Sequence, residues 1–199
     1  MRCALQADSS VGPLAGSLST RQQRAETNNP EQQRTQVMTD LQKGSQPDLP
    51  PMPEGFHELA LGPNPFLNVN GPLYGRYQDG RFTLGLRVEK RHCNPAGMCH
   101  GGMLLTFSDM TLIICSNVQS DLRRYMTTVN LSADFIRGVP EGSWLEGHTE
   151  VLRVTRNLVF TQAILSAEGE VAARVSGILK PTGEVDPRFT AERYFGRAD

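Results

Sequence analysis

The stretch Asn94-Pro-Ala-Gly-Met-Cys-His100-Gly101-Gly102, together with the apolar run at residues 103–115, decides how this chain of 199 residues folds. One acid, Asp109, interrupts the middle of that run. A carboxylate buried among large apolar side chains is costly to desolvate unless it is paired or used, so its presence asks for an explanation. The stretch therefore predicts a small active site, with two glycines at the point where a helix begins.

The composition predicts a single domain that follows a polar N-terminal segment. Residues 1–53 are rich in Gln, Ser, Thr, Asn and Pro and hold too few large apolar side chains to offset the entropy of ordering. We therefore expect a disordered arm over residues 1–53. The main domain is expected over residues 54–182 and a polar tail over residues 183–199.

Charge and hydropathy exclude several classes of protein. The formal net charge is -1 and there is no block of Lys or Arg that would follow a phosphate backbone, which argues against nucleic-acid binding. The longest apolar run, residues 101–115, is too short to span a bilayer. Residues 1–30 lack the apolar segment of a secretory signal. We expect a soluble, cytoplasmic protein that does not bind membranes.

The cysteines and the known motifs narrow the chemistry further. The chain has four cysteines without framework spacing, which fits free thiols in a reducing compartment: Cys3, Cys93, Cys99 and Cys115. The pairs His92-Cys93 and Cys99-His100 match none of the usual zinc-ligand spacings, so we expect no metal and no other cofactor. The chain also lacks the G-x-S-x-G motif of α/β-hydrolases and the phosphate-binding G-x-x-x-x-G-K-[ST] loop.

The pattern around residue 109 predicts strands that enclose one helix. Residues 101–118 are apolar around most of the helix circumference, and such a helix belongs inside a fold. In residues 125–136, alternation predicts a half-buried strand, with Val129, Leu131, Ala133 and Phe135 on one face and Thr128, Asn130, Ser132 and Asp134 on the other. Five further strands are expected at residues 71–77, 81–88, 143–154, 158–166 and 170–180.

Helix geometry separates the acid from the glycines. The helix would open with unpaired backbone N–H groups and the positive end of its dipole, and the two glycines would let a ligand approach that backbone. Asp109 lies eight residues beyond Gly101, which corresponds to about 12 Å along the helix axis. If both groups are catalytic, the carboxylate must meet a helix start supplied by another copy of the chain. The sequence thus predicts a site shared between subunits.

Asn94, His100-Gly101-Gly102 and Asp109, nine residues after the histidine, together resemble the hotdog-fold acyl-CoA thioesterases of the phenylacetate-degradation and thioesterase-superfamily type. The resemblance continues through Thr128-Val129-Asn130 and residues 151–160, and it covers residues 71–180. It implies an α+β hotdog fold, in which an antiparallel sheet wraps around one long central helix. It also implies that two subunits pair edge to edge, as a homodimer or as a homotetramer built from two dimers.

The resemblance further implies that the protein hydrolyses an acyl-CoA to the free acid and coenzyme A. The Gly101 N–H would polarise the thioester carbonyl, and Asp109 of the partner subunit would activate water as general base or attack as nucleophile. Thr128 would orient that water or steady the carboxylate. Asn94 and His100 would shape and polarise the carbonyl side of the site.

Substrate contacts are marked less sharply by the sequence. Near the acyl group and the phosphates of coenzyme A, the candidates are Gly102, Met103, Phe107, Arg153 and Arg156. The family commonly has a glycine in the turn where this chain carries Thr155. The pattern favours neither a fatty nor an aromatic acyl group.

Alternatives remain for the function of the protein and for the roles of the site residues. The chain is also compatible with a non-catalytic acyl-CoA binding module, although such a module has little use for a buried carboxylate. A hotdog-fold hydratase or dehydratase is a further alternative, but the G-H-F-P stretch or D-x4-H pair usual in that class is not evident. Structural readings also exist for the site residues: Gly101 in a close-packed turn, Asp109 bonded to backbone N–H groups, and Asn94 bridging the loop.

Overall fold

A computed structural model describes residues 51–196 of the chain. All but the end of the expected arm over residues 1–53 lies outside the described residues. The main elements are, in chain order, β1 (His57–Glu58), α3 (Pro65–Asn70), β2 (Tyr74–Gln78), β3 (Arg81–Arg87), η1 (Lys90–His92), α4 (Gly101–Gln119), β4 (Tyr125–Phe135), β5 (Trp144–Val154), β6 (Val159–Ala167), β7 (Glu170–Thr182), η2 (Pro187–Phe189) and α5 (Ala191–Tyr194).

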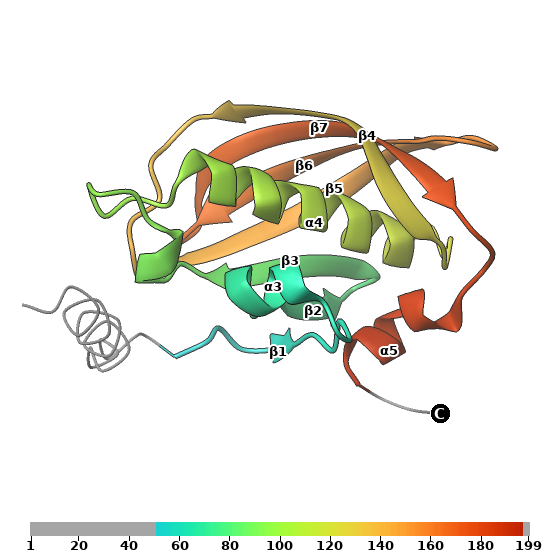
Figure 1. Cartoon of the computed structure of the whole chain (residues 1–199), viewed down its shortest axis with the longest axis horizontal. Helices are drawn as coiled ribbons and strands as arrows, with labels where there is room; N and C mark the ends of the chain where they lie inside the picture. The colour runs from blue at the N-terminus through green and yellow to red at the C-terminus, as the bar shows by residue number, and fades with distance from the viewer. Residues whose placement is uncertain (1–50, 197–199) are drawn as a thin grey trace, which may run out of the picture. The chain divides into compact units, whose positions relative to one another are not determined.

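Seven strands form one antiparallel sheet in the order β1-β2-β3-β5-β6-β7-β4. The sheet curves around the long helix α4, which lies along its inner face (Figure 1). Helix α4 contributes its buried side to the hydrophobic core, together with the inner faces of the strands. The predicted antiparallel sheet around one central helix is confirmed.

Two strand glycines allow α4 to approach the sheet closely. A Cβ atom at Gly177 in β7 would lie 2.6 Å from Leu112 Cδ1, and one at Gly147 in β5 would lie 2.7 Å from the Thr111 side chain. Leu112 and Thr111 are both 0% exposed. Close packing of this kind leaves no room for even one added methyl group. The glycines therefore fix the distance between the helix and the two strands.

Helix α4 confirms the helix predicted over residues 101–118 and ends one residue later. It has 19 residues, and its most apolar 18-residue window has a mean hydropathy of 1.3. By length and composition it could cross a membrane, but 56% of that window is buried inside the fold. Buried hydroxyls on the helix are satisfied locally, because Ser108 donates to Leu104 O at 2.7 Å and Thr111 donates to Phe107 O at 2.7 Å.

A β-bulge in β4 overturns part of the predicted face assignment. The register between β4 and β7 shifts at Val129, which becomes an extra residue in the strand. Val129 is 57% exposed, so it was wrongly placed on the buried face, whereas Phe135 keeps the face of Leu131 and Ala133 but is 51% exposed at the end of the strand. The inserted residue brings Thr128 to the same side as Leu131, where its hydroxyl contacts Asp109 of α4.

The segment after β7 packs on the domain and is not a free polar tail. Tyr194 of α5 is 4% exposed, and its carbonyl accepts a hydrogen bond from Ala60 N–H at 2.7 Å. Its ring lies 6.3 Å from the ring of Phe82, centroid to centroid. Aromatic residues near the end of the chain thus extend the core beyond the expected boundary at residue 182.

Candidate active site

The loop that leads into α4 is shaped by Asn94. The side-chain oxygen of Asn94 accepts hydrogen bonds from the N–H groups of Ala96 at 2.9 Å and Met98 at 3.3 Å, while its own N–H donates to Met98 O at 2.8 Å. Asn94 therefore bridges the loop through these hydrogen bonds, as the structural alternative for this residue predicted. Its side-chain nitrogen has no partner within residues 51–196, so a ligand contact through that atom is compatible with the loop.

His100 is the N-cap of α4. Its backbone has φ -62° and ψ 138°, and its Nδ1 accepts a hydrogen bond from Gly102 N–H at 2.9 Å. Because Nδ1 is the acceptor, the neutral ring carries its proton on Nε2. His100 is exposed, which leaves that N–H available at the surface beside the helix start.

Gly101 supplies an unused backbone donor. It is the first residue of α4, and its N–H has no hydrogen-bond partner in the described part of the chain. A Cβ atom at Gly101 would meet only the ring of Phe135 at 3.6 Å, which is an ordinary contact. The fold itself does not require a glycine here. The free N–H lies at the positive end of the helix dipole, where it can bind an oxyanion.

Asp109 and Thr128 form the second half of the site. Thr128 Oγ1 in β4 donates a hydrogen bond to Asp109 Oδ1 in α4. Asp109 was expected to be buried, but in the single chain it is only half-buried, because its helix position lies toward the open side of α4. Among residues 51–196, Oδ2 of Asp109 has no hydrogen-bond or ion-pair partner. The carboxylate is thus held by one oxygen and free to react at the other.

The single chain does not unite these two halves. His100, Gly101 and Gly102 lie at the first turn of α4, and Asp109 lies about 12 Å further along the same helix. Hollows of about 500 Å³ beside α3 and about 740 Å³ at the C-terminal end of α4 are lined by neither Gly101 nor Asp109. The structure therefore places the predicted catalytic residues in two separate groups, one at the start of α4 and one around Asp109 and Thr128.

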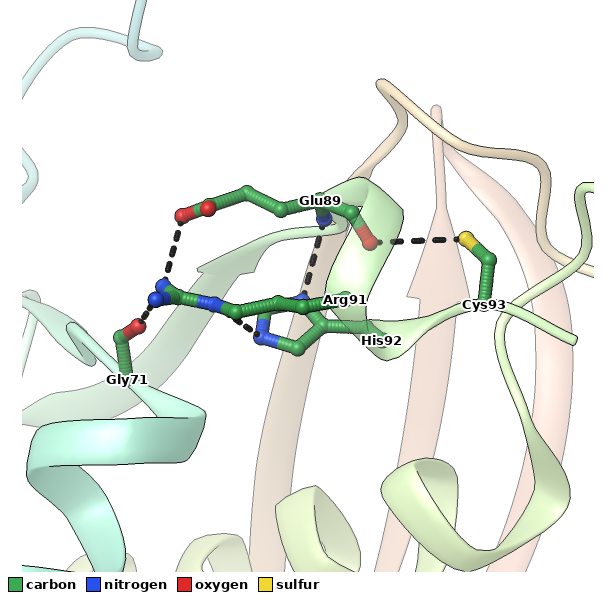
Figure 2. A network of polar contacts seen from close by, with 5 residues as sticks. All are labelled: Gly71, Glu89, Arg91, His92 and Cys93. Atoms are coloured by element: carbon green, nitrogen blue, oxygen red, sulfur yellow. Dashed lines mark hydrogen bonds and ion pairs between the residues drawn. The ribbon is translucent and has the colours of Figure 1, made fainter. Parts of the chain in front are cut away.

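A polar network behind the loop was not foreseen from the sequence (Figure 2). His92 Nδ1 accepts the Glu89 N–H at 3.0 Å, and Arg91 donates to Gly71 O and pairs with Glu89 Oε1 at 2.9 Å. Burial, reinforced by the neighbouring Arg91 charge, lowers the pKa of His92 to about 4. The network is connected to the start of helix α4, because His100 N–H donates to His92 O at 2.8 Å. The sequence signal that could have predicted this network is the spacing of Glu89 and His92, three residues apart, which form a capping box at the start of η1.

The candidate acyl contacts divide between surface and core. Gly102 is exposed at the start of α4. Met103 and Phe107 are 8% and 0% exposed and pack in the hydrophobic core of the single chain. The structure thus accounts for Phe107 by packing.

The candidate phosphate contacts lie at the turn between β5 and β6. Arg153 and Arg156 are exposed, and neither has an ion pair or hydrogen bond within residues 51–196. The turn is closed by Thr155, whose hydroxyl donates to Leu158 O and accepts from Leu158 N–H, both at 2.9 Å. The turn is therefore closed by the Thr155 hydroxyl. Across the same described residues, no three His, Cys, Asp or Glu side chains gather as a metal site.

Comparison with known proteins identifies the family. The sequence model described as "Thioesterase superfamily" matches residues 96–173, which run from the loop before α4 into β7. A protein of Pseudomonas aeruginosa strain PAO1, named a "putative esterase", is 34% identical over 128 residues, covering 64% of this chain and 95% of that protein. The chain belongs to the thioesterase superfamily.

Solved structures show the same fold. The PaaI protein from the phenylacetic acid degradation operon of E. coli is 16% identical, covers 62% of this chain and 88% of its own, and has a TM-score of 0.55. A phenylacetic acid degradation-related protein of Ralstonia eutropha JMP134 is 23% identical, covers 60% of this chain and 92% of its own, and has a TM-score of 0.53. At these identities the likeness concerns the fold, and it confirms the predicted hotdog architecture.

Proposed function

We propose that the protein hydrolyses acyl-CoA thioesters at a site shared by two subunits. The observation that carries this proposal is the half-buried Asp109 carboxylate, which Thr128 holds by one oxygen while the other has no partner in the described chain. A carboxylate restrained in this way is oriented for reaction and retains a free oxygen to accept a proton. Membership of the thioesterase superfamily supports hydrolase chemistry for such a group.

The reaction uses the helix start of one subunit and the acid of the other. The Gly101 N–H donates to the thioester carbonyl oxygen and stabilises the negative charge that develops on it as the tetrahedral intermediate forms. Asp109 of the partner subunit takes a proton from water, which attacks the carbonyl carbon, or attacks that carbon itself to form a mixed anhydride that water then hydrolyses to the free acid. The thiolate of coenzyme A then leaves. Thr128 of the partner subunit orients the Asp109 carboxylate through its hydrogen bond.

The side chains around the helix start complete the carbonyl side. His100 presents an Nε2–H beside Gly101, placed to donate to the carbonyl oxygen or to the departing sulfur. Asn94 holds the loop on which His100 stands. The guanidinium groups of Arg153 and Arg156, which have no partner within residues 51–196, suit the phosphates of coenzyme A, to which arginine binds through two parallel hydrogen bonds.

The edge strand β4 supports the pairing of subunits. Its only neighbour among the described strands is β7, so its other edge has free backbone N–H and C=O groups. It also exposes Tyr125 by 63% and Val129 by 57%. A long, apolar and unpaired edge is the feature that a second antiparallel strand covers.

The contacts within one chain support one particular register for that pairing. Asp109 contacts Thr128, and Gly101 lies next to Phe135, at the other end of the same strand. If two copies of β4 pair antiparallel about a two-fold axis near Ser132, Thr128 of one strand stands opposite Phe135 of the partner subunit. Asp109 then faces Gly101 of the partner subunit. The arrangement unites the two halves of the site twice in each dimer.

The proposal is tested by the thiol released from short, medium and aryl acyl-CoA substrates. Asp109→Asn keeps the shape of the side chain and an acceptor for Thr128, so it should fold normally and lose at least about 100-fold in kcat. Asp134→Asn is the matched control, since Asp134 is an exposed carboxylate of β4 that pairs with Arg174 at 2.6 Å. An Asp109→Asn enzyme as active as its parent would overturn the mechanism. Tight binding of acyl-CoA by the parent without any turnover would instead identify a binding module.

A further inference from the structure

Two cysteines face each other at the base of the active-site loop. Cys93 and Cys99 form an isolated antiparallel bridge. The flanking bonds run from Asn94 N–H to Met98 O and from His100 N–H to His92 O, both at 2.8 Å. Cys93 and Cys99 are therefore a non-hydrogen-bonded pair, the arrangement in which opposite Cα atoms lie about 4.5 Å apart. That separation falls within the range of about 4.4 to 6.8 Å over which a disulfide spans two Cα atoms.

Both side chains are free thiols that differ in access. Cys93 is half-buried, and its Sγ lies 3.4 Å from Glu89 O (Figure 2). Cys99 is 6% exposed, and its Sγ lies 3.9 Å from His100 O. Burial raises the pKa of both thiols, that of Cys99 to about 12. Cys93 is thus the thiol that a reagent from solvent meets first, and alkaline pH speeds its reaction.

We propose that Cys93 and Cys99 form a reversible disulfide when the protein meets a low-molecular-weight disulfide such as oxidised glutathione. The Cys93 thiolate attacks one sulfur of the reagent, forms a mixed disulfide and releases one glutathione thiolate. Cys99 then attacks the Cys93 sulfur and releases the second glutathione. Two protein thiols are oxidised, one glutathione disulfide is reduced to two thiols, and the two protons go to solvent or to the released glutathione. In a reducing compartment such a bond is transient and senses redox state.

The disulfide would close the loop that ends at the N-cap of α4. Because the backbone already has the required spacing, the bond forms without moving His100 or Gly101, and we expect kcat to change by less than about twofold. The short loop gives a modest entropic gain, which we expect to raise Tm by about 5 °C. Amide exchange of the residues between the two cysteines should slow, since they no longer open independently.

Mass spectrometry of the full chain carrying Cys3→Ser tests the proposal. Treatment with oxidised glutathione at mildly alkaline pH should lower the mass by about 2 Da, with one peptide cross-link between Cys93 and Cys99, and a dithiol should reverse both changes. The Cys99→Ser variant should stop at a glutathione adduct on Cys93, about 305 Da heavier. Cys115→Ser is the control, because Cys115 is 0% exposed in the core and should not affect the bond. A parent protein that remains fully reduced, keeps the adduct on Cys93, or links Cys115 would overturn the proposal.

Discussion

Replacing Gly101 with proline removes the proposed oxyanion donor while leaving the fold intact. Proline has no N–H, and it is favoured at the first position of a helix, where the N–H is unpaired in any case. The residue before a proline must be extended, and His100 already has φ -62° and ψ 138°. Since the Gly101 N–H has no partner in the described chain, no hydrogen bond of the fold is lost. We expect the free energy of unfolding to change by less than about 1 kcal/mol.

The catalytic effect of Gly101→Pro should be far larger than its effect on stability. Loss of one oxyanion-hole donor costs about 100- to 1000-fold in kcat, or roughly 3 kcal/mol of transition-state stabilisation. Gly101→Ala is the matched control, because it keeps the N–H and its Cβ meets only the Phe135 ring at 3.6 Å. Thiol release measured over a range of acyl-CoA concentrations separates kcat from KM. If the proline and alanine variants have kcat values within about threefold of each other, the Gly101 amide is not the oxyanion donor.

Mixing inactive variants tests whether the site crosses the subunit boundary. A dimer of one Gly101→Pro chain and one Asp109→Asn chain has one intact site and one doubly damaged site. Random assembly of equal amounts should therefore restore about a quarter of the parent activity. If both groups acted within one chain, the mixture would stay as inactive as its components.

Three further changes are predicted from contacts in the structure. Thr128→Val removes the hydroxyl that holds Asp109 and should lower kcat by about 10- to 100-fold, whereas Thr128→Ser should stay within about threefold of the parent in the same thiol-release assay. Gly177→Ala places a Cβ 2.6 Å from Leu112 Cδ1, which should cost about 1 to 3 kcal/mol and lower Tm by several degrees in a thermal melt. Burial lowers the pKa of His92 from 6.5 to about 4, so the unfolded chain binds this proton at higher pH than the folded chain does. The stabilisation of the folded state by neutral His92 is then fully present above pH 6.5 and is lost as the pH falls toward 4. Over this range the free energy of unfolding should fall by roughly 3 kcal/mol. Urea titrations at about pH 5 and about pH 7 should show a smaller pH effect in His92→Gln than in the parent.

The sequence predicted the helix and most strands because each has a strong local period. Apolar residues surround most of α4, and β6 and β7 alternate along their length, so burial could be read from neighbours in the chain. The prediction failed where the period breaks. Val129 is an extra residue in β4, and a simple alternation cannot reveal a bulge that exists only in the pairing with β7. The packing of Tyr194 was likewise missed, since its partner Phe82 is distant in the chain.

By itself, the sequence determined that Asp109 and Gly101 are too far apart on one helix to act on one atom, since helical rise depends only on their spacing. Only the tertiary structure decided what holds each group. The bulge at Val129 turns Thr128 inward to Asp109, and the packing of Phe135 beside Gly101 sets both groups along the edge strand β4. These relations depend on strand register and packing depth, which arise from contacts between distant parts of the chain and not from local pattern.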